Sequence, residues 1–122
     1  MSRAGRQAAY RRGGRGEMRA ALLLRLKGYR ILERRWRVPV GEVDLIARKG
    51  NLVVFVEVKA RATNRAAAES ILYRQRRRIE RAASAFLAVR PELSGLGARF
   101  DAILIAPGRW PKHIKAAWLS GE

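Results

Sequence analysis

Apolar residues recur along this chain with two spacings, which separate the expected helices from the expected strands. From Glu17 to Lys27 they recur every three or four residues, which is the spacing of a helix with one buried face. Gly28 follows directly and suits the left-handed residue that ends many helices. The same spacing over residues 74–89 predicts a second helix, which Pro91 ends.

Five shorter segments predict β-strands, because each alternates apolar and polar residues or is rich in Val, Ile and Phe. We expect these strands at residues 29–36, 40–47, 52–59, 98–106 and 112–118. The third is apolar almost throughout, which predicts a central strand with both faces buried. Gly50 or Asn51 can adopt a positive φ, so a tight turn is expected between the second and third strands.

These elements follow one another in the order α-β-β-β-α-β-β, and we expect a single α/β domain over residues 16–122. Residues 1–15 are rich in Arg, Gly and Ala and are expected to form a flexible basic arm. Between the third strand and the second helix, Thr63 and Asn64 could cap a short helix over residues 65–70.

The composition excludes several classes of protein. Of 122 residues, 48% are hydrophobic, so a packed core is possible and wholesale disorder is not expected. The chain has no cysteine, which leaves out disulfide frameworks and thiolate metal sites and fits a reducing cytoplasm. Its longest wholly apolar stretches, such as residues 20–24, are far shorter than the roughly 20 residues of a membrane span. We therefore expect no membrane association.

The charge balance points to a polyanionic partner. The chain has 27 Lys plus Arg against 10 Asp plus Glu, a net charge of +17. Residues 1–40 carry +10 of this charge and residues 61–90 carry +6, with a neutral segment between them. Most cations are Arg, whose planar group suits phosphate. Nucleic acid is the expected partner, although a GC-rich genome that favours Arg codons or association with the ribosome would also explain the charge.

Three charged residues interrupt the two most apolar strands: Asp44, Glu57 and Lys59. Glu57 and Lys59 are two residues apart and share a face, and a tight hairpin would bring Asp44 level with Glu57. Two buried carboxylates repel each other, and a hard divalent cation such as Mg²⁺ or Mn²⁺ removes this penalty. A neighbouring lysine can then assist an attacking water. The alternative is a partly solvated salt bridge among the same groups.

Several motifs together resemble the YraN (UPF0102-type) family of small bacterial proteins. The motifs are Gly16-Glu17, Gly28-Tyr29, Gly41-Glu42-Val43-Asp44-Leu45-Ile46-Ala47, Val54-Phe55-Val56-Glu57-Val58-Lys59 with Arg61, and Arg99-Phe100-Asp101. The resemblance covers residues 16–118. It implies the fold of the restriction-endonuclease-like superfamily, similar to archaeal Holliday-junction resolvases, with a mixed central sheet flanked by helices.

The resemblance also implies roles for individual residues. Asp44 and Glu57 correspond to the metal ligands of that superfamily, and Lys59 to its catalytic lysine. Glu17 corresponds to a catalytic glutamate of the first helix in resolvase-like members, although a carboxylate at a helix N-terminus is also favoured by the helix dipole. This chain has Val43 where the superfamily often has Pro. It has Arg35 followed by Trp where family members often carry Asn.

Other residues complete the expected site. Glu42 is a candidate alternate ligand, with a salt bridge to Arg37 or Arg61 as the plainer interpretation. Gln75 opens the second helix and could lie over the site or act only in capping. The residues expected to bind nucleic-acid phosphates are Arg11, Arg12, Arg61, Arg74, Arg76, Arg77, Arg78 and Arg81. An ordinary solvated helix face is the alternative for the last five.

A histidine-based catalytic pair or zinc site is not expected, because His113 is the only histidine. The sequence thus predicts a nucleic-acid-binding protein with Mg²⁺- or Mn²⁺-dependent endonuclease-like activity on structured or branched DNA, favoured over RNA. Symmetric cleavage would call for a homodimer. A catalytically silent nucleic-acid-binding module and a small accessory protein of ribosome or polymerase are the alternatives.

Overall fold

The computed structural model describes residues 16–60 and 73–120 of the chain. Its strands are β1 (Arg30–Val38), β2 (Gly41–Lys49), β3 (Leu52–Ala60), β4 (Gly97–Ile105) and β5 (Lys112–Trp118). Residues 16–26 are helical and are called helix 16–26 below, α3 spans Tyr73–Ala88, and a 3-10 turn, η1, spans Pro91–Leu93. The predicted order is confirmed. The helix proposed over residues 65–70 and the arm over residues 1–15 lie outside the described residues.

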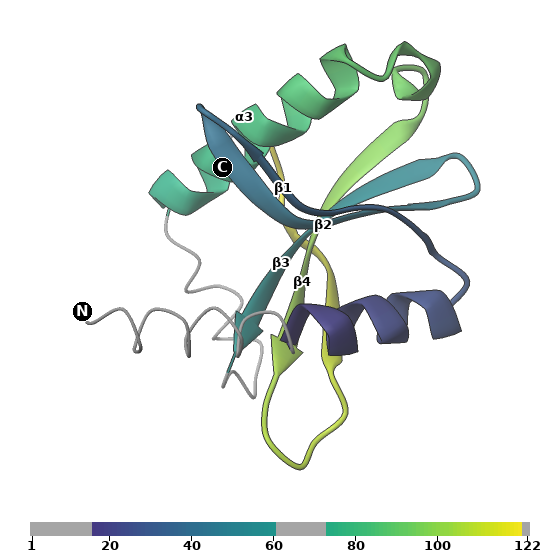
Figure 1. Ribbon diagram of the computed structural model, residues 1–122, viewed down its shortest axis with the longest axis vertical. Helices are drawn as coiled ribbons and strands as arrows, with labels where there is room; N and C mark the ends of the chain where they lie inside the picture. Colours follow the sequence, from purple (N-terminus) through teal and green to yellow (C-terminus); the bar gives the residue numbers. More distant parts are fainter. Residues whose placement is uncertain (1–15, 61–72, 121–122) are drawn as a thin grey trace.

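The strands form one sheet in the order β1-β2-β3-β4-β5 (Figure 1). Neighbouring strands are antiparallel except β3 and β4, which are parallel. α3 lies in the crossover between these two strands, as a parallel pair requires. The prediction of a central third strand is confirmed, since Val53–Val56 of β3 are buried.

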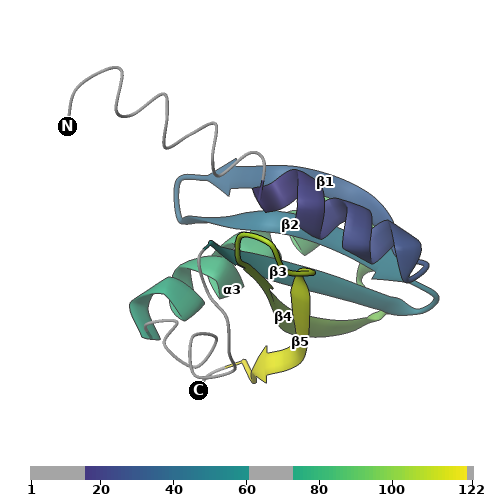
Figure 2. The same ribbon diagram turned by 90° about the horizontal axis from the view of Figure 1, so that it is seen from below.

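A helix covers each face of the sheet (Figure 2). Helix 16–26 packs on one face through an apolar stripe of Ala20, Ala21 and Leu24, which contacts side chains such as Val56 of β3. α3 packs on the opposite face, where Phe86 contacts Phe55 of β3 edge-on. Both cores contain side chains of β3, because successive side chains of a strand point to opposite faces of the sheet.

The β1–β2 hairpin bends away from β3 and leans on α3 (Figure 1). β2 pairs with β3 only from Leu45 to Lys49, whereas its pairing with β1 continues to Gly41. A Cβ at Gly41 would lie 1.9 Å from the carbonyl oxygen of Arg78 in α3, so only glycine permits this approach. The bend separates β2 from the carboxyl end of β3, and Asp44 lies at the point of separation.

Candidate functional site

The side chain of Asp44 accepts a hydrogen bond from β3 at the point where the backbone pairing of β2 and β3 ends. The β2–β3 ladder stops at the pair Leu45 and Val56. Two residues further along β3, the backbone amide of Val58 donates a hydrogen bond to Oδ2 of Asp44 at 2.8 Å. The carboxylate therefore satisfies an amide that the departing strand leaves unpaired, and this contact fixes the carboxylate beside β3.

Glu57 lies against Asp44, as the hairpin register predicts. The two carboxyl groups share a side-chain hydrogen bond. Burial raises the pKa of Glu57 to about 8, and the negative charge of Asp44 adds to this effect, whereas Lys59 opposes it. Burial also raises the pKa of Asp44, although the hydrogen bond from Val58 counteracts the rise. The pair thus holds a proton at neutral pH.

Lys59 and Gln75 meet on the side of the sheet that α3 covers. Val53 and Phe55 of β3 pack into the core under α3, and Glu57 and Lys59 continue the same alternation. Nζ of Lys59 donates to Oε1 of Gln75 at 3.5 Å. Gln75 therefore contacts Lys59 from the first turn of α3, which is compatible with the position over the site considered from the sequence.

Glu17 approaches the site from the other helix. It is only 8% exposed, one helical turn before Ala20 and Ala21 of the apolar stripe, and Nε of Arg35 donates to its Oε2 at 2.5 Å. Burial raises the pKa of Glu17, the hydrogen bond from Arg35 lowers it, and the charge of Asp44 raises it again. Three carboxyl groups, from helix 16–26, β2 and β3, therefore interact electrostatically around Asp44.

The backbone of Arg35 itself is strained. Its φ is +55°, in the left-handed region that Gly and Asn tolerate better than Arg. Arg35 and Asp44 fall between the paired residues of β1 and β2, so the strain coincides with the bend of the hairpin. Arg35 was not predicted as a site residue. Its only signal was the resemblance, which implies an Asn near this position.

Glu42 forms an exposed ion pair with Arg37 at 3.3 Å, which confirms the plainer of its two interpretations. Its charge still contributes to the raised pKa values of Asp44 and Glu57. Within residues 16–60 and 73–120, no three Asp, Glu, His or Cys side chains are grouped so that they could hold a metal ion. The donor set near the bend is therefore two carboxyl groups in contact, with Glu17 bound to Arg35.

The expected row of cations on α3 is only partly exposed. Arg78 and Arg81 are exposed, whereas Arg76 and Arg77 are half-buried, and Arg77 lies 3.9 Å from Glu80. Phosphate binding by this row stays a prediction, and Arg78 and Arg81 are its more accessible members. Arg74 is the second residue of α3. The other predicted phosphate ligands, Arg11, Arg12 and Arg61, lie outside the described residues.

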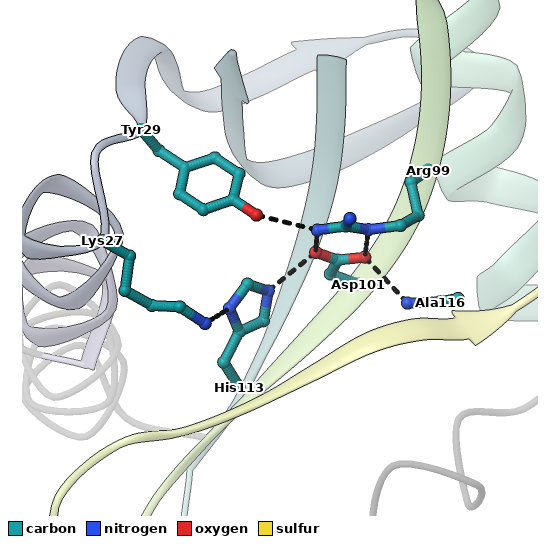
Figure 3. Close-up of polar contacts among 6 residues, drawn as sticks. All are labelled: Lys27, Tyr29, Arg99, Asp101, His113 and Ala116. Carbon is teal, nitrogen blue, oxygen red and sulfur yellow. Dashed lines mark hydrogen bonds and ion pairs between the residues drawn. The ribbon is translucent and has the colours of Figure 1, made fainter. Parts of the chain in front are cut away.

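A second polar cluster was not predicted (Figure 3). Its centre is Asp101, which is fully buried and accepts hydrogen bonds from Arg99, from Nε2 of His113 and from the backbone of Ala116. A histidine-based site was not expected from the sequence, because His113 is the only histidine. The one available signal was Arg99 and Asp101 two residues apart, on one face of β4.

No helix within the described ranges has the length and apolar character needed to cross a membrane. The tryptophan side chains differ in their burial. Trp36 packs edge-on against Phe86, and its Nε1 donates to the carbonyl of Ala82. Trp118 is buried, whereas Trp110 is 76% exposed.

Comparison with known proteins shows the family. Uncharacterised protein family UPF0102 matches residues 16–105. A UPF0102 protein of Paramagnetospirillum magneticum is 59% identical over 116 residues, which cover 92% of this chain and 90% of the relative. Another from Maricaulis maris is 52% identical over 122 residues, covering 100% of this chain and 95% of the relative. The resemblance to YraN (UPF0102-type) proteins is confirmed, and this chain belongs to the UPF0102 family.

Proposed function

We propose that this protein binds nucleic acid and acts as a Mg²⁺- or Mn²⁺-dependent endonuclease-like phosphodiesterase on structured or branched DNA. The observation that carries the proposal is the hydrogen-bonded pair of Asp44 and Glu57, with Lys59 two residues beyond Glu57 on the same face. Two acids and an amine meet where β2 leaves β3, which is the combination that phosphodiester hydrolysis with a hard cation uses.

The donor set fits a divalent cation. Without one, the pKa of Glu57 is raised to about 8, chiefly by burial and then by the charge of Asp44. Mg²⁺ is commonly held by one or two carboxylates, with waters and substrate phosphates completing its coordination. Asp44 and Glu57 would hold the ion, and a bound ion would supply a more acidic water and offset charge on the phosphate.

The remaining residues have roles that follow from their contacts. The Val58 amide keeps the Asp44 carboxylate in place, so Glu57 is the group that must release a proton. Lys59, in contact with Gln75, would orient the attacking water or stabilise charge on the phosphate. Glu17 would contribute an oxygen or orient water once Arg35 moves aside.

The charge distribution supports the choice of substrate. Arg78 and Arg81 are exposed on α3, the helix whose first turn contacts Lys59. They would contact phosphates without reading bases, which suits recognition of DNA by its shape. Cleavage of both strands of a symmetric junction calls for a homodimer. A cysteine-free chain suits work in the cytoplasm.

Nuclease assays test this function directly. Purified protein is incubated with four-way junction, flap and duplex DNA in the presence of Mg²⁺ or Mn²⁺. Asp44→Asn and Lys59→Met should each lower cleavage by roughly a hundredfold or more, the loss typical when a charge-stabilising group is removed. Glu42→Gln, which removes an exposed carboxylate beside the site, is the matched control. Cleavage that persists unchanged in Asp44→Asn and Lys59→Met would overturn the proposal.

A catalytically silent nucleic-acid-binding module is the second candidate. It is favoured by one observation: in the described part of the chain, no three Asp, Glu, His or Cys side chains are grouped so that they could hold a metal ion. Such a module would bind DNA through its arginines without a metal. Titration calorimetry with Mn²⁺ separates the two candidates, because a folded protein that binds DNA but no Mn²⁺ would support the silent module.

A further inference from the structure

Lys27, His113 and Asp101 form a line joined by two polar contacts (Figure 3). Nζ of Lys27, just after helix 16–26, lies 2.5 Å from Nδ1 of His113 in β5. Nε2 of the same imidazole lies 2.7 Å from Oδ2 of Asp101 in β4. An amine, a base and a carboxylate that orients the base are the three parts of an activated nucleophile.

The contacts of Asp101 fix which imidazole nitrogen carries the proton. Asp101 is fully buried, and burial alone would raise its pKa. Hydrogen bonds from His113, Arg99 and the Ala116 amide lower that pKa to about 2 instead, so the group is a carboxylate at any physiological pH. Nε2 of His113 therefore donates to Asp101, and Nδ1 presents its lone pair to Lys27.

We propose that Lys27 is a site of covalent acylation, with an acyl phosphate as the donor. The lone pair of the neutral Lys27 amine attacks the carbonyl carbon of the donor, and the bond from that carbon to the phosphate oxygen breaks. Phosphate leaves with the electron pair, and the proton of the amine passes to Nδ1 of His113. The buried carboxylate of Asp101 stabilises the imidazolium formed in this step.

The surroundings of Lys27 lower the pKa of its amine and would attract an anionic donor. An isolated lysine holds its proton about four pH units more tightly than an isolated imidazole. Burial lowers the pKa of Lys27, and the charges of Lys115 and Lys49 lower it further, whereas Tyr29 and Asp101 oppose this. The Lys27 side chain is half-buried, so a small donor can reach it. Lys49 and Lys115 would attract the phosphate group.

The test compares lysines within one molecule. The chain has five, at positions 27, 49, 59, 112 and 115. The wild-type protein is incubated with acetyl phosphate, and the acetylation rate at each lysine is followed by peptide mass spectrometry. Lys27 should react roughly a hundredfold faster than the exposed Lys112, at the low end of what a positioned base contributes. Equal rates at these two lysines would overturn the proposal, and this comparison needs no variant.

Variants then show whether the reaction rate at Lys27 depends on His113 as a base or only on the exposure of the lysine. His113→Gln keeps a hydrogen-bond acceptor but cannot take up a proton, and it should lower the rate at Lys27 to within roughly twofold of Lys112. Lys112→Arg is the control and should leave Lys27 unchanged. A folded His113→Gln protein in which Lys27 still reacts as in the wild type would reject His113 as the base. None of these measurements depends on nuclease activity.

Discussion

The carboxyl groups of Asp44 and Glu57 share a hydrogen bond although the backbone pairing of their strands ends one residue earlier. One proton between two acids means that the pair carries one negative charge rather than two at neutral pH. This arrangement links the protonation of the site to folding and to the binding of any cation.

Stability should fall as pH rises through the titration of Glu57. Its pKa is raised from 4.5 to about 8 in the folded state, so the folded protein keeps a proton that the unfolded chain releases. The stabilisation is complete below about pH 4.5 and is lost as pH rises through about 8. Urea unfolding between about pH 5 and about pH 9 should therefore show a flatter profile for Glu57→Gln than for the wild type. Parallel profiles for the two proteins would contradict this. Glu42→Gln should keep the fall in stability with pH, because it leaves the carboxyl group of Glu57 in place, although the loss of the Glu42 charge should move that fall to slightly lower pH.

Binding of Mn²⁺ should release about one proton per ion near pH 7, because Glu57 is protonated there and a ligand carboxylate must be ionised. Calorimetry in two buffers with different ionisation enthalpies measures this number. Glu57→Gln should release no proton and bind the ion more weakly, whereas Glu42→Gln should behave as the wild type. Binding with no proton release in the wild type would mean that the ion lies elsewhere.

Gly41→Ala should destabilise the protein strongly. The new Cβ would lie 1.9 Å from the Arg78 carbonyl oxygen, and neither backbone can yield without unpacking the hairpin from α3. We expect a loss of about 3 kcal/mol or more in the free energy of unfolding. Gly95→Ala is the matched control, since nothing lies within 4 Å of its Cβ position. Similar urea midpoints for the two variants would show that the hairpin does not lean on α3.

Arg35→Asn should have opposite effects in two backgrounds. In the wild type it removes the cation bound to the buried Glu17 carboxylate, so the protein should lose stability. In the Glu17→Gln background that ion pair is already gone, and relief of the left-handed backbone should add about 1 kcal/mol. A double-mutant cycle measured by urea unfolding gives both values. Destabilisation of equal size in both backgrounds would argue against strain at Arg35.

Asp101→Asn should cost roughly 3–5 kcal/mol, the range for breaking a buried ion pair, because Arg99 loses its two contacts of 2.7 Å. Asp101 contributes stability above the unfolded pKa of 3.8, and this is lost as pH falls toward about 2. The acid-unfolding midpoint should therefore move to higher pH in the variant. Glu92→Gln, which removes a 59% exposed partner of Arg90, should change stability by less than about 1 kcal/mol.

The sequence was sufficient for the elements and for the acidic pair, because both depend on local patterns. Alternation places Glu57 and Lys59 on one face, and a tight turn brings Asp44 level with Glu57. The left-handed backbone of Arg35 was not predictable from its residue type, since it follows from the bend of the hairpin onto α3. The hydrogen bonds of Asp101 could not be predicted for another reason: most of the groups that donate them come from other parts of the chain.

The order of the strands also affects the order in which contacts can form while the chain is being synthesised. β2 and β3 are joined by a tight turn, whereas β4 pairs with β3 only after the whole α3 crossover. Closing a short loop loses less entropy than closing a long one. A nascent chain that has emerged from the ribosome as far as the end of β3 could already bring Asp44 beside Glu57. The partners of Asp101 in β4 and β5 would follow later, so the contact between Lys27 and His113 of β5 would be among the last to form.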